Sequence, residues 1–133
     1  MKIYAGKFKI TAWSEQPCQE IASGKTFSRS SVKHIYSGDL NGESAVEYII
    51  YYISETESKF VGLEFFKGSL NGRTGTLVLQ HAGTMKDGVS TSSWAVLRAS
   101  GTGGLGDIDG KGRYKTLNHE EAAYEFTVKN ETT

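Results

Sequence analysis

Residues 60–83 read FVGLEFFKGSLNGRTGTLVLQHAG, and this stretch decides the fold that we expect. Two runs of alternating apolar and polar residues flank Asn71-Gly72, and such runs joined by Asn-Gly are a strong signal for a β-hairpin. A two-residue turn places Glu64 and His81 on the same face of the hairpin. The stretch therefore predicts two antiparallel strands that present a carboxylate and an imidazole among large apolar side chains.

Short strands are expected along the rest of the chain. Gly is frequent, Pro occurs once, and aromatic and β-branched residues gather in short runs, as is typical of strands separated by sharp turns. No stretch keeps helical spacing for long, and the best helix candidate, residues 118–123, is very short. We expect a single all-β domain over residues 1–133, with Pro17 ending the first strand. The other strands are expected over residues 2–14, 26–37, 43–54, 92–100, 105–115 and 123–129.

Eight strands joined in sequence by short connections predict one antiparallel up-and-down sheet. A sheet of that length removes its unpaired edges by closing on itself, so we expect an eight-stranded β-barrel with little or no helix. The interior of a barrel of this size is filled by side chains or holds one small ligand.

A five-residue motif occurs three times, at 38–42 (GDLNG), 68–72 (GSLNG) and 106–110 (GDIDG). Asn-Gly and Asp-Gly suit type I′ turns, because both central residues need positive φ. We expect two-residue hairpin turns at Asn41-Gly42 and Asn71-Gly72, whereas the third copy fits either a turn or a bend inside a strand. None is a phosphate-binding loop, because no Lys-Ser/Thr pair follows and no strand-to-helix context surrounds it.

The two expected turns determine which side chains share a face of the four central strands. They place His34 opposite Ile49 and Tyr36 opposite Glu47. This face carries carboxylates and histidines among aromatic residues, which is the usual form of a ligand cavity, so we assign it to the lumen. Its members are Val32, His34, Tyr36, Glu47, Ile49, Tyr51, Phe60, Glu64, Phe66, Leu77, Leu79 and His81.

The opposite face of the same strands is also rich in apolar residues, among them Ile35, Tyr48, Leu63 and Phe65. A monomeric barrel needs only one apolar face. We therefore expect the second face to be covered in a homo-oligomer, with a dimer favoured.

The composition excludes several classes of function. Lys plus Arg equals Asp plus Glu at 15 each, which argues against a general nucleic-acid binder and gives no reason to expect a membrane surface as partner. Cys18 is the single cysteine, so no intrachain disulfide can form and the sequence gives no reason to expect an oxidising compartment. The N-terminal residues alternate in polarity and do not resemble a signal peptide, and no apolar run is long enough for a membrane helix. We expect a cytoplasmic protein.

Glu64 is the first candidate for chemistry, as a general acid or base or as an anchor for a polar group of a ligand. Its apolar surroundings should raise the pKa of its carboxyl unless a cation pairs with it, and Arg29 and Arg98 are the expected cations. His81 and Glu47 are the other catalytic candidates, and for each carboxylate or histidine a purely structural role remains the alternative.

We expect no metal and no cofactor. Glu47, His34 and His81 would come from three strands without a recognisable metal-binding spacing. No Gly-x-Ser-x-Gly elbow or Ser-His-Asp order indicates a hydrolase. The residues expected to line the ligand pocket are Trp13, His34, Tyr36, Glu47, Tyr51, Glu64, Phe66, His81 and Trp94.

These residues resemble a family of small bacterial proteins catalogued as domain of unknown function number 3224, over nearly the whole chain. The markers are Trp13 with Glu15 and Pro17, residues 38–42 and 60–64, Gly72-Arg73-Thr74-Gly75, Gln80-His81-Ala82-Gly83, Trp94, and residues 100–103. Gly104 stands where the family pattern has an acidic residue, which puts any role for that position in doubt. The resemblance implies an eight-stranded barrel similar to allene oxide cyclase, and it implies no activity.

Three functions follow as hypotheses. The first is binding of a small apolar or amphipathic molecule in the lumen. The second is a cofactor-independent isomerase, cyclase or lyase that uses Glu64 as acid or base, assisted by His81 or Glu47. The third is a structural or assembly module whose lumen is filled by its own aromatic side chains. The volume of the lumen separates the third from the others, and the protonation of Glu64 separates the first from the second.

Overall fold

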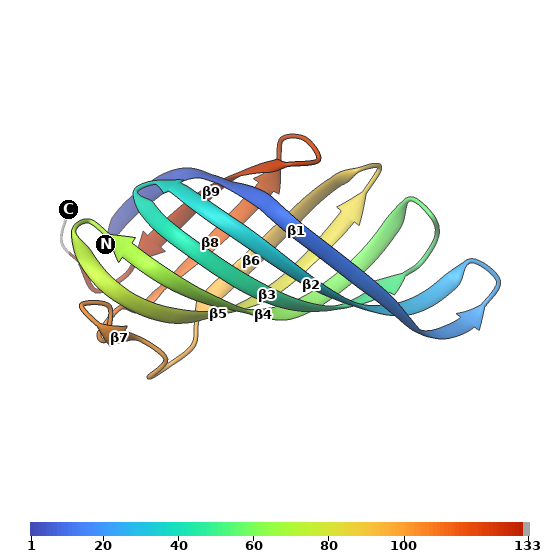
Figure 1. The fold of residues 1–133 in the computed structure, drawn as a ribbon, viewed down its shortest axis with the longest axis horizontal. Coiled ribbons are helices and arrows are strands. Elements are labelled where there is room, and N and C mark those ends of the chain that lie inside the picture. Colours follow the sequence, from blue (N-terminus) through green and yellow to red (C-terminus); the bar gives the residue numbers. More distant parts are fainter. Residues whose placement is uncertain (132–133) are drawn as a thin grey trace.

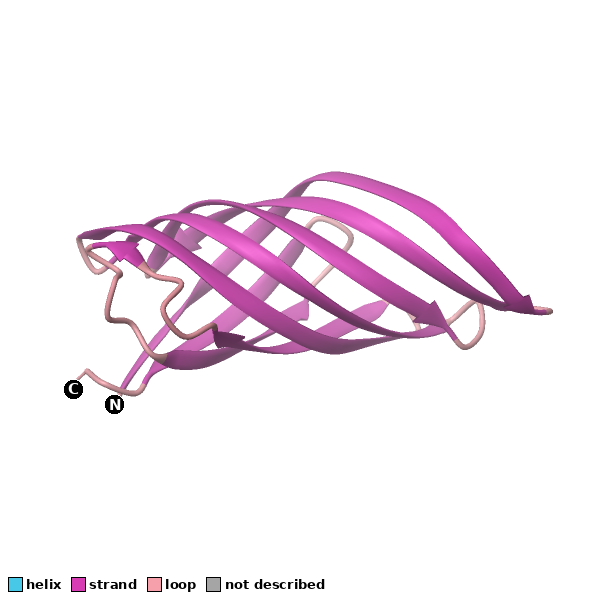
Figure 2. Cartoon of the chain, turned by 90° about the horizontal axis from the view of Figure 1, so that it is seen from below, coloured by secondary structure: helices cyan, strands magenta, loops and turns pink. Residues whose placement is uncertain are grey.

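The computed structural model describes residues 1–131, and every regular element in that range is a β-strand (Figure 1, Figure 2). Within this range there is no helix of the length and apolarity needed to cross a membrane. The strands are β1 (Lys2–Ala22), β2 (Lys25–Gly38), β3 (Leu40–Tyr52), β4 (Glu57–Leu70), β5 (Arg73–Lys86), β6 (Val89–Val96), β7 (Thr102–Gly103), β8 (Gly110–Thr116) and β9 (Glu121–Val128).

The nine strands form one antiparallel sheet that closes in a ring. Each strand from β1 to β5 pairs with the next, β6 pairs with β8, β8 with β9, and β9 returns to β1. In the described part of the chain β7 pairs with β5 alone, so it lies beside the ring rather than in it. The N-terminus and the C-terminal segment lie at the same end, and the β1–β2 hairpin projects from the other (Figure 1).

Three local predictions are corrected by the structure. β1 continues past Pro17, because the register with β2 shifts directly after it and such an irregularity accommodates a residue without a backbone N–H. The strand expected over 105–115 begins only at Gly110, and the third copy of the motif lies in the turn region before it. Residues 118–123 form bends and the start of β9, not a helix.

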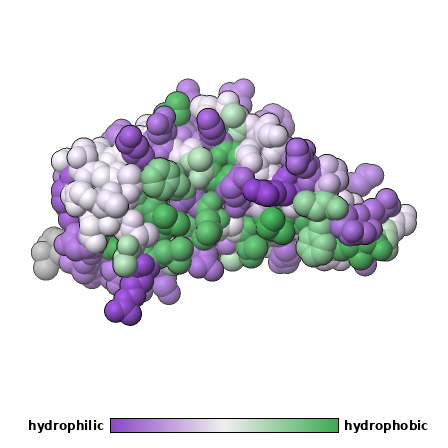
Figure 3. Space-filling view, turned by 60° about the horizontal axis from the view of Figure 1, so that its bottom comes forward, coloured by the Kyte–Doolittle hydropathy of each residue, from purple (hydrophilic) through white to green (hydrophobic). Residues whose placement is uncertain are grey.

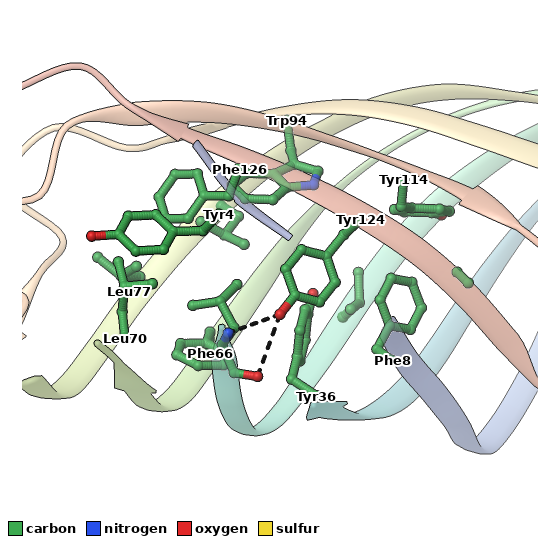
Figure 4. Packing of buried hydrophobic residues seen from close by; sticks show 14 of the residues in the cluster. Tyr4, Phe8, Tyr36, Phe66, Leu70, Leu77, Trp94, Tyr114, Tyr124 and Phe126 are labelled. Carbon is green, nitrogen blue, oxygen red and sulfur yellow. Dashed lines mark hydrogen bonds between the residues drawn. The ribbon is translucent and has the colours of Figure 1, made fainter. Parts of the chain in front are cut away.

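Along β2, β3 and β4 the side chains alternate between a buried inner face and a more exposed outer face, as the period of two requires. The inner face carries the core. Figure 4 shows aromatic side chains of this core packed near one another inside the closed sheet. One end of the interior is packed with large buried side chains. The large side chains there are Leu70, Leu77, Leu105, Phe126 and Val128, each with no more than 1% of its surface exposed.

The β4–β5 hairpin turns where the sequence predicts. Leu70 pairs with Arg73 across Asn71-Gly72, and the register continues in step to Glu57 and Lys86. The prediction that Glu64 and His81 point to the same face is confirmed, because both are buried on the inner face.

The β2–β3 hairpin does not turn at Asn41-Gly42, and that prediction is wrong. The chain reverses at Gly38 and Asp39, so Tyr36 pairs with Gly42 instead of Glu47 and His34 pairs with Ser44 instead of Ile49. The offset is odd, and an odd offset moves every side chain of β3 to the other face.

Glu47, Ile49 and Tyr51 consequently lie on the outer face rather than in the lumen, while the alternate residues of β3 point inward. The outer face of β2, β3 and β4 carries a set of half-exposed apolar side chains, and Figure 3 shows hydrophobic surface gathered in a band on one face of the molecule. The set comprises Ile35, Ile49, Val61, Leu63 and Phe65.

Candidate functional site

Glu64 lies at the centre of a buried polar cluster near the middle of the ring. Its side chain has no exposed surface, and its Oε2 accepts hydrogen bonds from Tyr36 OH (2.6 Å) and Ser44 Oγ (2.5 Å) and contacts His34 Nδ1 at 3.2 Å. Its Oε1 contacts His81 Nε2 at 2.6 Å. Four strands supply the cluster, because β2 brings His34 and Tyr36, β3 brings Ser44, and β5 brings His81.

The environment of Glu64 keeps its carboxyl ionised. Burial by itself raises the pKa, but the hydrogen bonds from His34 and His81 and the attraction of histidine charge outweigh burial and hold the pKa of Glu64 well below its usual range. Histidines therefore take the place of the arginines that we expected as partners. Arg29 lies on the outer face with Glu47 (Nη2 to Oε1, 3.2 Å), and Arg98 lies in the loop after β6.

The Glu64 carboxylate has no free position for a substrate. An ionised carboxylate is an acceptor with about four lone-pair sites, and four donor groups already surround this one. A strongly bonded carboxylate with a lowered pKa is a weak base and is not protonated at neutral pH. Glu64 is therefore suited to orient its partners rather than to exchange protons itself.

His81 is also fully engaged. Its Nδ1 contacts Ser92 Oγ at 2.8 Å while its Nε2 contacts Glu64, and its side chain has no exposed surface. Ser44, Tyr36 and the two histidines thus surround the carboxylate, and Ser92 contacts the far side of His81. His81 has no nitrogen left with which to contact a ligand.

His34 differs from His81 because only one of its nitrogens is used. Nδ1 faces Glu64, and no residue in the described range hydrogen-bonds Nε2. Nε2 is not among the fully enclosed side-chain atoms of the described range that lack a hydrogen-bond partner, so it borders open space.

His34 lines both an outer groove over β2, β3 and β4 and a cavity of about 190 Å³ inside the ring. Because its buried ring stacks on Phe8, which also lines the cavity, we take Nε2 to border the cavity. The cavity opens at the end of the ring where Trp13, Tyr52 and Met85 lie, and His34 borders its inner part. The walls are mostly apolar. They comprise Phe8, Ile10, Trp13, Val32, His34, Tyr48, Ile50, Tyr52, Ser58, Phe60, Met85, Ser90, Tyr114 and Thr116.

Two tyrosines give the cavity wall a pair of hydroxyls. Tyr48 OH and Tyr114 OH lie 3.1 Å apart. Burial raises the pKa of Tyr114 to about 12, and burial together with the charges of Tyr114 and Glu64 raises the pKa of Tyr48 well above its usual range. Both hydroxyls therefore keep their hydrogens at any physiological pH.

A larger hollow of about 560 Å³ lies on the outer surface over β5, β6, β8 and β9. Its lining includes the charged side chains Arg113, Lys115 and Glu125, and the ion pair between Arg113 and Glu125 is largely solvent-exposed. It presents no buried polar side chain without a partner, so the inner cavity is the better candidate for a binding site.

The structure brings together six of the nine residues expected in the pocket. His34, Tyr36, Glu64, Phe66, His81 and Trp94 are all buried on the inner face. Of these, His34 borders the cavity, and the others pack around or beyond the polar cluster. Trp13, though 54% exposed, lines the cavity mouth. Glu47 and Tyr51 do not belong to the site because they lie on the outer face.

Sequence reasoning missed Ser44, Ser92, Tyr48 and Tyr114. Ser44 and Tyr48 were missed because the turn was predicted at Asn41-Gly42, which places both residues on the outer face. The observed turn at Gly38-Asp39 places both on the inner face. Ser92 and Tyr114 had no local signal, because their roles depend on pairings of β6 with β5 and β8. Within the described range no group of three or more His, Cys, Asp or Glu residues is arranged to hold a metal ion.

Comparisons with known proteins place the chain beside proteins whose function is also open. A family model described as "Protein of unknown function (DUF3224)" matches residues 4–128. A crystal structure of a DUF3224-family protein of unknown function from Shewanella oneidensis MR-1 is 25% identical, with a TM-score of 0.73, and the match covers 97% of this chain and 98% of that one. A search of curated proteins found no match.

Proposed function

We propose that this chain, which belongs to the DUF3224 family of proteins of unknown function, binds one small apolar or amphipathic molecule in its inner cavity. The observation that carries the proposal is the unpartnered Nε2 of His34 beside about 190 Å³ of mostly apolar space. Apolar walls with a few convergent polar groups are the usual form of a ligand site.

The cavity size limits the ligand. An engineered apolar cavity of about 150 Å³ holds benzene, so this space suits a molecule of one ring or a short branched chain. Long acyl chains and polycyclic compounds exceed it unless they extend through the mouth. The mouth is framed by Trp13 and by Tyr52, whose hydroxyl donates to Glu15 Oε2 at 2.7 Å.

The two alternatives receive less support. An isomerase, cyclase or lyase that uses Glu64 directly as acid or base conflicts with the saturated, ionised carboxylate, and Glu47 lies outside the ring. A filled lumen describes the end of the ring that holds Leu70 and Phe126, but not the end that holds the cavity.

Native mass spectrometry of protein purified from its own host tests the proposal. We expect a bound molecule of small mass in the wild type and its loss in Ile50→Trp, because Ile50 lines the cavity and the larger side chain fills it. Ile49→Trp is the matched control, since Ile49 is the next residue on β3 and is 47% exposed on the outer face. Equal retention by both variants would place the molecule outside the cavity and contradict the proposal.

We also propose that the ring closes as an eight-stranded barrel of the allene oxide cyclase type and that two copies pair as a homodimer. Support for the barrel is the cyclic pairing of eight strands. Support for the dimer is the apolar set at Ile35, Ile49, Val61, Leu63 and Phe65, which lies among charges of both signs and so suits pairing with a second copy. Light scattering of wild type and Leu63→Lys tests the dimer, which the variant should convert to monomer.

A further inference from the structure

The two histidine contacts of Glu64 differ in length. His81 Nε2 lies 2.6 Å from Oε1, whereas His34 Nδ1 lies 3.2 Å from Oε2. Both contacts involve the ionised Glu64, but a nitrogen that itself carries a positive charge gives the shorter kind of contact, at about 2.7–2.9 Å. The shorter contact therefore fits a positively charged His81 and the longer contact a neutral His34.

The surroundings of His81 agree with this assignment. Ser92 Oγ lies near the carbonyl oxygens of Ala82 (3.5 Å) and Ser93 (3.4 Å), which accept its hydrogen and leave its oxygen to accept from His81 Nδ1. His81 then donates from both nitrogens, to Ser92 and to Glu64. Its positive charge balances the negative charge of Glu64, so the cluster next to the cavity is electrically neutral.

The state of His34 follows from its partner. The ionised Glu64 only accepts hydrogen bonds, so the hydrogen of a neutral His34 lies on Nδ1. Nε2 then carries a lone pair, and it borders the cavity. The cavity thus presents a hydrogen-bond acceptor that calls for a donor on the ligand.

The tyrosine pair supplies the complementary group. Tyr48 OH and Tyr114 OH share one hydrogen bond, which uses one of their two hydrogens. The second hydrogen meets no acceptor on the described residues other than the paired oxygen, so it is available as a donor at the cavity wall. A ligand hydroxyl satisfies both requirements, because it donates to Nε2 and accepts from a tyrosine.

We propose that the cavity selects a neutral, single-ring aromatic alcohol, a phenol in the simplest case, whose hydroxyl donates to His34 Nε2. The inference rests on the proposed function and adds the chemical class of the ligand. The ring size follows from the cavity volume, and ring edges and faces of Phe8, Tyr48, Phe60 and Tyr114 form much of the wall. A carboxylate is disfavoured because its charge would lose hydration to apolar walls and meet a lone pair.

Titration calorimetry with four probes of similar size tests the inference: phenol, anisole, toluene and benzoate. We expect phenol to bind about ten-fold tighter than toluene, the order of one hydrogen bond in a buried site. Anisole, which lacks the donor, should bind no tighter than toluene, and benzoate should bind weakest. In His34→Phe the advantage of phenol over toluene should disappear, while Ile49→Trp should leave it unchanged.

Nitrogen NMR of His34 in the wild type provides a readout that requires no variant. We expect a neutral ring with hydrogen on Nδ1, and we expect the Nε2 resonance to move when phenol is added and to stay when toluene is added. Equal binding of phenol and toluene with an unmoved Nε2 resonance overturns the inference and leaves the proposed function standing. Preference for benzoate also overturns it, because His34 would then be charged. Failure of all four probes to bind overturns both.

Discussion

The hairpins β2–β3 and β4–β5 carry almost the same five residues, GDLNG at 38–42 and GSLNG at 68–72, yet they turn at different places. The second turns at Asn71-Gly72, where both residues have positive φ (51° and 79°). The first turns at Gly38 (φ 95°) and Asp39, and its Asn41-Gly42 lies inside β3. The difference decides which residues of β3 reach the interior.

Tertiary contacts explain the early turn of the first hairpin. The Tyr124 hydroxyl from β9 accepts from Leu40 N and donates to Ser37 O, both at 2.8 Å. Asp39 binds the backbone of Ala5 twice, through its own N–H (3.0 Å) and through its carboxylate (2.8 Å). These contacts hold the chain reversal over the interior, where a turn three residues later would lose them.

The second hairpin turns in open space. A Cβ added at Gly72 would meet no atom within 4 Å, so only the local preference of Asn-Gly acts there. The two motif copies also pair with each other across β3 and β4, with Leu40 opposite Leu70 and Gly42 opposite Gly68. The same sequence thus serves as a turn in one copy and as a site of close strand approach in the other.

The largest expected effect separates the two equivalent glycines. In Gly42→Ala the new Cβ would lie 2.3 Å from Lys67 O and 2.6 Å from Gly68 Cα at a φ of 148°, so we expect a loss of about 4 kcal/mol or more in the free energy of unfolding. Gly72→Ala meets open space at a φ of 79° and should cost about 1 kcal/mol. Urea unfolding measures both. Similar losses would show that the two copies play the same role.

The next largest effect on the free energy of unfolding distinguishes the two candidate carboxylates, Glu64 and Glu47. Glu64→Gln removes the charge at the centre of the buried cluster, and we expect a loss of about 3–5 kcal/mol because His81 and its neighbours remain buried without it. Glu47→Gln breaks only an exposed contact with Arg29 and should change the free energy of unfolding by less than about 1 kcal/mol. Thermal and urea unfolding at neutral pH check the pair, and comparable losses would refute the placement of Glu47 outside.

A third substitution weakens the support of the first turn alone. Tyr124→Phe leaves Leu40 N and Ser37 O without their hydroxyl partner, so we expect a loss of about 1–3 kcal/mol. Hydrogen exchange should quicken at the β2–β3 turn and remain unchanged at the β4–β5 turn. Tyr51→Phe, on the outer face of β3, is the control and should alter neither turn.

The smallest effect is the pH dependence of stability that Glu64, the buried carboxylate of the second hairpin, produces. The pKa of Glu64 is lowered in the folded protein, so the unfolded chain takes up a proton below pH 4.5 while the folded chain does not. Stability from Glu64 is therefore complete above that pH and falls as the pH is lowered, by at most about 1.4 kcal/mol per pH unit. The free energy of unfolding of wild type and of Glu64→Gln, measured between pH 5 and 3, isolates the contribution of Glu64. Parallel curves of this free energy against pH would contradict the expected dependence.

Much of the fold was predictable from local pattern. Alternation with period two indicates strands, and Asn71-Gly72 determines one hairpin and therefore the common orientation of Glu64 and His81. His34 and Tyr36 were also predicted inside correctly, because β2 itself keeps its alternation and only its pairing with β3 was misjudged. The prediction that Pro17 ends the first strand was wrong, because a register shift directly after Pro17 lets the strand continue.

The sequence by itself determined that this is an all-β chain with a carboxylate and histidines on one face, because side-chain alternation and an unobstructed turn are local properties. Only the tertiary structure decided which serines and tyrosines join them. The β2–β3 turn depends on Tyr124, which is far away in the chain, and the partners of Glu64 come from strands that meet only when the ring closes. Contacts of that kind form between distant segments, so no short stretch of sequence contains them.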